Sequence, residues 1–161
     1  MIQPNIIELQ PKRMLGKSVR MTLAENKTYE LWRSFQMQRS IIENAVGNDL
    51  YSLQLYDQLL DPQSFLPTTP FTKWALTEVT NQDNIPKGYK PFVLSGGLYA
   101  VFDLIGSIPE FIALNNYIFA EWLPNSNYQL DHRAHFELLG QNYKPNDPAS
   151  EEQVWIPIKI K

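Results

Sequence analysis

The run Ala134-His135-Phe136-Glu137-Leu138-Leu139-Gly140 has the alternation of a β-strand, with an acid between two apolar residues. Successive side chains of a strand point to opposite faces, so Phe136 and Leu138 share one face and Glu137 points to the other. If the apolar face packs on a core, the surroundings of Glu137 decide its role. Open water would make it an ordinary solvated residue, whereas an aromatic cavity would make it a buried anion that requires a cationic or polarised partner.

Outward from this run, sequence features recur with a period of about 80 residues. Gly16 and Gly97 each interrupt a strand-like run. Each run leads to a capping-box pattern, Thr22-Leu23-Ala24-Glu25 in the first half and Ser107-Ile108-Pro109-Glu110 in the second. Apolar residues with helical spacing follow both patterns, and we expect the second helix to end before Pro124.

Two more strands follow each predicted helix. Residues 50–56 correspond by position to the strand that contains Glu137, which makes Gln54 its equivalent. In the same way, Trp74 and Trp155 mark a second pair of corresponding strands. This order predicts an α+β fold made of duplicated strand-helix-strand-strand units, with pseudo-twofold symmetry, an antiparallel sheet and a pocket between the two halves.

The length of 161 residues fits one domain, 1–161, with one half at about 6–80 and the other at about 89–160. The chain is 43% hydrophobic and 19% charged, which is typical of a globular protein. A net charge of −3 without a basic cluster argues against a nucleic-acid partner. Without an apolar run of membrane length or a leader pattern, we expect a cytoplasmic protein with no membrane partner.

The sequence lacks the residues that several kinds of functional site require. The chain contains no cysteine, which excludes disulfides, zinc–thiolate sites and cysteine nucleophiles. His132 and His135 are the only histidines, and two ligands are too few for a zinc site, so we expect no metal. No nucleophile elbow or Gly-rich phosphate loop occurs, and we expect no cofactor.

Several aromatic residues are candidates for lining a pocket, although packing in the core is the alternative for each. Trp155 alternates with apolar neighbours in its strand, and Trp122 continues the apolar stripe of the second helix, where core packing is favoured. Tyr117 departs from that stripe and carries a hydroxyl that needs a partner. Trp32 and Tyr56 are the candidates from the first half, and Gln54 is the polar candidate through its correspondence with Glu137.

The chain resembles the GyrI-like small-molecule-binding domain, which is also the effector-binding part of some AraC-type and MerR-type transcription regulators. The resemblance spans roughly residues 6–160, and it rests on the order and spacing of several short motifs. These are Ala24-Glu25-Asn26-Lys27-Thr28, Asp49-Leu50-Tyr51-Ser52, Leu98-Tyr99-Ala100-Val101-Phe102, Glu121-Trp122-Leu123-Pro124-Asn125-Ser126, His135-Phe136-Glu137 and Trp155-Ile156-Pro157-Ile158-Lys159.

The resemblance implies a pocket between the halves, with a Glu on the second strand of the second half, which is Glu137 here. In multidrug-sensing members this Glu and its aromatic neighbours receive lipophilic cations. The regulators carry a separate helix-turn-helix domain. Because the first strand is expected by about Ile6, we expect a stand-alone form.

Three functions stay open at this point, and we expect binding rather than catalysis. The first is binding of a small hydrophobic, cationic or polarised molecule, with Glu137 as counter-charge. The second, also implied by the resemblance, is hydrolysis of reactive cyclopropane-bearing genotoxins with Glu137 as acid or base. The third is interaction with a protein partner such as DNA gyrase or a regulator. The sequence does not specify an oligomeric state.

Overall fold

The computed structural model describes residues 2–161 of the chain. The strands are β1 (Asn5–Leu9), β2 (Lys12–Met21), β3 (Ala45–Leu55), β4 (Phe71–Val79), β5 (Lys90–Leu94), β6 (Gly97–Ile105), β7 (Tyr128–Leu130), β8 (His135–Leu139) and β9 (Glu151–Ile160). The helical elements are α1 (Thr28–Met37), a 3-10 turn η1 (Arg39–Ile41), α2 (Ile108–Tyr117), a π-helical turn η2 (Ile118–Trp122) and α3 (Leu123–Asn125). Of the helices within residues 2–161, none combines the length and apolar character that a membrane crossing needs.

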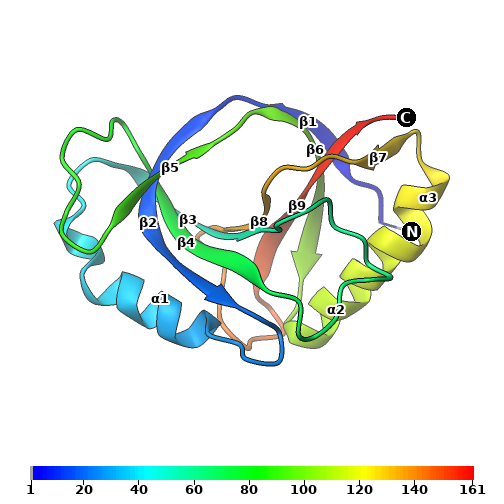
Figure 1. Ribbon diagram of the computed structural model, residues 1–161, viewed down its shortest axis with the longest axis horizontal. Helices are drawn as coiled ribbons and strands as arrows, with labels where there is room; N and C mark the ends of the chain where they lie inside the picture. The colour runs from blue at the N-terminus through cyan, green and yellow to red at the C-terminus, as the bar shows by residue number, and fades with distance from the viewer. Residues whose placement is uncertain (1) are drawn as a thin grey trace.

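The strands form one antiparallel sheet with a symmetric order, because corresponding strands of the two halves lie at equal distances from its centre. The order is β1-β6-β9-β8-β3-β4-β2-β5, with β7 paired to β9 (Figure 1). The first half contributes β2, α1, β3 and β4, and the second contributes β6, α2, β8 and β9. The β3–β8 pair joins them at the centre. The predicted α+β class and duplicated arrangement are therefore confirmed.

The strand that precedes each unit is exchanged between the halves. Strand β1 opens the chain but pairs with β6 of the second unit, whereas β5 precedes the second unit and pairs with β2 of the first. These two strands form the outer edges of the sheet. The exchange ties the halves together, because each unit completes its sheet with a strand from the other part of the chain.

The register shows which residues of the two halves correspond. The tryptophans of β4 and β9 lie opposite Leu53 and Phe136, respectively. The next residues of β3 and β8, Gln54 and Glu137, are therefore equivalent, as predicted. The central β3–β8 pair places Ser52 opposite Glu137, so residues of both halves meet on one face at the junction.

The predicted correspondence of Gly16 and Gly97 is wrong by two residues. Gly16 pairs with the residue two positions after Trp74, whereas the residue in the equivalent place of β6 is Tyr99. The two glycines meet different steric requirements. A Cβ on Gly16 would overlap the carbonyl oxygen of Ala75, whereas Gly97 has a φ of +131°, which favours glycine.

The two main helices begin differently, although both were predicted to begin with a capping box. α2 follows Ser107, whose backbone N–H donates to the Glu110 carboxylate at 3.3 Å, and the capping box is present. In the first half, the Thr22 hydroxyl instead accepts from the N–H of Glu25 within a turn, and α1 begins only at Thr28. The hydrogen bond between Thr22 and Glu25 therefore lies before α1. The prediction that this pattern caps the first helix is wrong.

The helical path of the second half continues through Pro124, contrary to the prediction. The π-helical turn η2 lies between α2 and α3, and Pro124 occupies the first turn of α3. Proline lacks the N–H that would continue the helical hydrogen bonds, and α3 ends one residue later, at Asn125.

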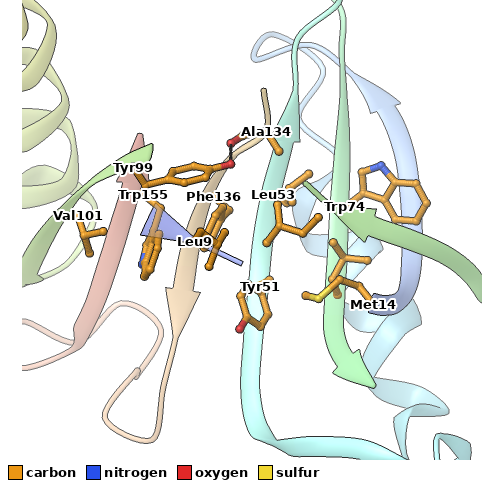
Figure 2. Close-up of a cluster of buried hydrophobic side chains, with 12 residues drawn as sticks. Leu9, Met14, Tyr51, Leu53, Trp74, Tyr99, Val101, Ala134, Phe136 and Trp155 are labelled. Atoms are coloured by element: carbon orange, nitrogen blue, oxygen red, sulfur yellow. Dashed lines mark hydrogen bonds between the residues drawn. The ribbon is translucent and has the colours of Figure 1, made fainter. Parts of the chain in front are cut away.

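The two faces of the sheet have different partners. α1 packs on β2 and β4, and α2 packs on β6, so both cover one face on either side of the β3–β8 pair (Figure 1). The opposite face carries a hydrophobic cluster, part of which Figure 2 shows. Its buried members are Leu9, Met14, Tyr51, Leu53, Trp74, Leu76, Leu94, Tyr99, Val101, Ala134, Phe136 and Trp155.

Candidate functional site

Glu137 lies on β8 at the centre of the sheet and points to the helix-covered face. Its neighbours Phe136 and Leu138 belong to the cluster on the opposite face, where the Phe136 ring stacks on Trp155 with centroids 5.1 Å apart (Figure 2). The predicted alternation of this strand is therefore confirmed. The Glu137 side chain is only 14% exposed, so it is not an ordinary solvated residue.

Two residues of the first half approach one oxygen of the Glu137 carboxylate. The side-chain amide of Gln54 donates to Oε1 at 3.2 Å. The Nζ atom of Lys73 lies 3.9 Å from the same oxygen, and its side chain is 8% exposed. Within residues 2–161, no side-chain hydrogen bond reaches Oε2, so Gln54 holds only one of the two carboxylate oxygens.

Sequence reasoning missed Lys73, although β4 contains a usable signal. The strand is otherwise largely apolar, and Lys73 is buried within it. A buried lysine needs an anionic partner, because an isolated ammonium is costly in a low-dielectric environment. The register places Lys73 opposite Gln54, and β3 separates it from Glu137. The pairing of Lys73 with Glu137 therefore depends on the order of the three strands β4, β3 and β8 in the sheet.

For both Glu137 and Lys73, burial and the partner's charge shift the pKa in opposing directions. Burial raises the pKa of Glu137, and the Lys73 charge and the Gln54 hydrogen bond partly offset this increase. Burial likewise lowers the pKa of Lys73, and the charges of Glu137 and Glu152 oppose this decrease. Each group thus depends on its partner to stay charged.

A second carboxyl belongs to the same electrostatic group. Burial, together with the charge of Glu137, raises the pKa of Glu152 to about 7, and Lys73 opposes the increase. Tyr143, in the segment between β8 and β9, is also influenced by the charges of both carboxylates. Burial raises its pKa, and the charges of Glu152 and Glu137 raise it further. The face around Glu137 therefore holds one cation and two acids.

Aromatic rings border this charged group at the β3 end. The ring of Tyr56 contacts that of His135 edge-on at 5.0 Å, and it lies 5.6 Å from Phe71 and 5.4 Å from Phe65 between centroids. Burial lowers the pKa of His135 to about 3, so its ring is neutral at physiological pH. Burial and the Glu137 charge raise the pKa of Tyr56. The Tyr56 hydroxyl thus lies within the field of the carboxylate.

A cavity of about 310 Å³ opens beside these rings. The connection between β3 and β4 forms it, and its lining includes Tyr56, Leu60 and Phe65 but not Glu137. Leu60 also packs against the cluster beneath α2, so this connection reaches from the junction toward that helix (Figure 1). The volume lies at the lower end of the range for ligand pockets. A second cavity, of about 420 Å³, lies between β2 and α1.

The structure brings some predicted site residues together and separates others. Gln54 and Tyr56 lie with Glu137, whereas Trp155 is buried on the opposite face. Trp32 packs against Phe35 of α1, with centroids 5.5 Å apart.

Two further candidates pack beneath α2. Trp122 stacks on Tyr128 and meets Phe102 edge-on, while the Tyr117 hydroxyl donates to the carbonyl of Ile2 at 3.0 Å. Helical spacing placed Trp122, but not Tyr117, on the apolar face of the second helix, and it did not show which elements this face meets. Within residues 2–161, no three His, Cys, Asp or Glu side chains gather as metal ligands would.

A comparison with protein families gave a match over nearly the whole chain. The model of the GyrI-like small molecule binding domain family matches residues 2–159. The search among curated proteins found no match.

Solved structures share the fold at low sequence identity. SAV2435 bound to tetraphenylphosphonium gives a TM-score of 0.68 at 15% identity, covering 98% of this chain and 94% of that one. The EcmrR C-terminal domain gives 0.68 at 11% identity, covering 100% and 99%, respectively. A hydrolase from Listeria innocua gives 0.60 at 11% identity, covering 98% and 92%.

Proposed function

The chain belongs to the GyrI-like small molecule binding domain family, and we propose that it binds a small hydrophobic cation or polarised molecule beside Glu137. The observation that carries the proposal is the environment of this carboxylate. Glu137 is largely buried, and burial raises its pKa, so an arriving cation stabilises its charged form. Only one of its oxygens is held by Gln54, which leaves Oε2 for a ligand.

The neighbouring rings supply the apolar part of the site. Tyr56 and Phe65 line the adjoining cavity, and Tyr56 also lies within the field of Glu137. A cation within about 6 Å of an aromatic ring gains roughly 0.5–2 kcal/mol, depending on how dry the site is. Charge and rings together favour a molecule that is both cationic and lipophilic.

Lys73 limits the strength of this binding. Its ammonium lies 3.9 Å from Glu137, so an incoming cation meets a carboxylate that is already partly compensated. The contact is longer than a hydrogen bond, and Lys73 makes no side-chain hydrogen bond within residues 2–161. A ligand that approaches Oε2 can therefore share the carboxylate with Lys73 instead of displacing it.

Titration with tetraphenylphosphonium, the ligand bound by SAV2435, tests the proposal. Isothermal titration calorimetry should give saturable binding to the parent chain. Glu137→Gln keeps the size of the side chain and removes its charge, so we expect affinity to fall about tenfold, equivalent to about 1.4 kcal/mol. Glu8→Gln, at an exposed position of β1, is the matched control and should leave affinity unchanged. Equal affinities for all three proteins would reject Glu137 as the counter-charge.

Hydrolysis of strained cyclopropane-bearing genotoxins is a second candidate function. The favouring observation is that burial raises the pKa of both Glu137 and Glu152, the latter to about 7. A carboxyl with a pKa near the working pH is suited to general acid–base catalysis. Chromatography of such a compound, incubated with parent chain or Glu137→Gln, should show turnover only with the parent. A substrate that stays intact with both proteins would remove this candidate.

A further inference from the structure

The larger of the two cavities, between β2 and α1, is not part of the proposed cation site. Its volume of about 420 Å³ falls within the range for ligand pockets. The residues that line it, which include Lys17, Leu31 and Ser34, all belong to the first half of the chain. None of them lines the cavity beside Tyr56, so the two cavities are separate.

Lys17 is a cation in an otherwise apolar row of β2. Leu15 and Val19 share its strand face, and both pack in the cluster beneath α1. The Lys17 ammonium is held at the wall of the cavity by two neighbours. Its Nζ atom donates to the Ser34 hydroxyl at 2.9 Å and lies 5.0 Å from the centroid of the Tyr89 ring.

The repeat shows that the fold does not require a lysine at this position. Gly16 and Tyr99 occupy equivalent places, so the residues that follow them, Lys17 and Ala100, are equivalent as well. Ala100 is fully buried beneath α2, together with Phe102. Apolar packing therefore fills the place in the second half where the first half has an ammonium beside a cavity.

The polar groups of this cavity are mainly hydrogen-bond donors. An ammonium can only donate, so the Ser34 oxygen accepts from Lys17 and the serine keeps its own hydrogen for another acceptor. Within residues 2–161, that hydroxyl donates to no protein group, and neither Lys17 nor Lys27 forms an ion pair. Two lysines and one exposed glutamate, Glu30, line the cavity, which leaves a net charge of +1.

We propose that this cavity binds a small carboxylate with a hydrocarbon tail. The carboxylate accepts hydrogen bonds from the Lys17 ammonium and the Ser34 hydroxyl, and the tail lies on Val19 and Leu31. The aliphatic stems of the two lysines extend this apolar surface. An inorganic anion gains nothing from the apolar wall, and an uncharged hydrocarbon gains nothing from the ammonium. The combination therefore selects an amphipathic anion.

This inference goes beyond the proposed cation binding and does not depend on it. The two sites have opposite charge, because Glu137 attracts a cation whereas Lys17 and Lys27 repel one. Tetraphenylphosphonium and a carboxylate should therefore bind at different places. Either proposal can fail while the other stands.

Titration of the isotope-labelled parent chain with octanoate at neutral pH, followed by two-dimensional NMR, tests the inference. We expect saturable shifts of the backbone amide signals of Lys17, Leu31 and Ser34, and no saturable shift at Glu137. Octanol has the same chain length but no charge. It should bind at least about tenfold more weakly, because it cannot form a charge-assisted hydrogen bond with the ammonium.

Two variants identify the groups that hold the carboxylate. Lys17→Met keeps an aliphatic side chain and removes the charge, so affinity for octanoate should fall about tenfold. Ser34→Ala removes one donor and should weaken binding about threefold. Lys144→Met, at an exposed position between β8 and β9, is the matched control and should leave the affinity unchanged. The same spectra show whether each variant is folded.

Three outcomes would overturn the inference. The first is octanol binding as tightly as octanoate, and the second is the absence of saturable shifts at the cavity residues. Both are measured on the parent chain, so neither needs a variant to fold. The third is an affinity of folded Lys17→Met for octanoate that equals that of the parent.

Discussion

Glu137 of β8 and Lys73 of β4 form an ion pair across β3, with 3.9 Å between Oε1 and Nζ. Gln54 of the intervening strand donates to the same oxygen at 3.2 Å. The pair joins the two halves of the chain at their junction, on the face that lies between the helices (Figure 1). Because both charges are largely buried, a change in either one should alter ligand binding at the other.

Removing the Lys73 charge should strengthen cation binding. In Lys73→Met, the carboxylate of Glu137 loses its internal partner, so an incoming cation meets an uncompensated anion. We expect affinity for tetraphenylphosphonium to rise about tenfold, or about 1.4 kcal/mol, at pH 8, where an unpaired carboxyl is more fully ionised. Calorimetric titration measures this change.

Lys73→Arg is the control for this prediction, because it keeps a cation near Glu137 and should leave affinity close to that of the parent. Lys73→Met should also lower the free energy of unfolding, since it leaves a buried carboxylate without its partner. If Lys73→Met binds the cation no more tightly than Lys73→Arg, the ion pair does not limit binding.

The Glu152 carboxyl should make stability depend on pH between about 4.5 and 7. Its pKa in the folded protein is about 7, above its ordinary value of 4.5, so folding favours the protonated form. The resulting stabilisation is complete below pH 4.5 and is lost as the pH rises toward 7. Gln cannot ionise, so Glu152→Gln should raise the melting temperature relative to the parent more at pH 7.5 than at pH 5.

The comparison of variant with parent also separates Glu152 from His135. Burial lowers the pKa of His135 to about 3, so its stabilisation is present above its ordinary pKa of 6.5 and is lost as the pH falls. This contribution has the opposite sign, but it is shared by both proteins. Glu151→Gln, one residue away and exposed, should show no such pH-dependent gain. A gain of equal size for both variants would exclude Glu152 as the source.

The sequence predicted much of this arrangement, because period-two alternation and a repeated order of elements are local properties. Alternation placed Glu137 opposite Phe136, and the repeat identified Gln54 as its equivalent. Alternation does not show which face of a strand meets a ligand, so Trp155 was a candidate although it lies on the opposite face.

Other features depend on contacts between distant segments. Lys73 reaches Glu137 only because β3 lies between their strands, and no local pattern gives that order. The exchange of β1 and β5 was not foreseen, because each pairs with a unit other than the one that follows it. Gly16 and Gly97 illustrate a further limit, since a repeat of residue type does not establish equivalence of position.

Gly97 should tolerate no side chain. Its φ is +131°, and a Cβ there would lie 2.8 Å from the guanidinium carbon of Arg133, which donates to the carbonyls of Leu98 and Ile158. We expect Gly97→Ala to lower the free energy of unfolding by about 2–4 kcal/mol, through backbone strain and disruption of these hydrogen bonds. Urea denaturation measures this loss.

Gly47→Ala is the matched control for the steric part of this cost. Gly47 also has a positive φ, of +85°, but a Cβ there meets no atom within 4 Å. Its substitution should therefore cost only the backbone strain, roughly 1–2 kcal/mol. Equal losses for Gly97→Ala and Gly47→Ala would show that the contact with Arg133 does not contribute.

Substitutions on the two faces of the sheet should have separable effects. Trp155 is buried in the cluster opposite Glu137, and it stacks on Phe136 at 5.1 Å (Figure 2). We expect Trp155→Ala to lower the free energy of unfolding by about 3–5 kcal/mol, because it leaves a cavity in the core. In the fraction that remains folded, affinity for tetraphenylphosphonium should stay within twofold of the parent.

Tyr56→Leu should show the reverse pattern, because its ring lines the cavity beside Glu137. Loss of the ring face should weaken binding of tetraphenylphosphonium about three- to fivefold, equivalent to about 0.6–1 kcal/mol. Urea denaturation and calorimetric titration of both variants measure the two effects. If Trp155→Ala weakens binding more than Tyr56→Leu does, the ligand lies on the opposite face of the sheet, and the site assigned to Glu137 is wrong.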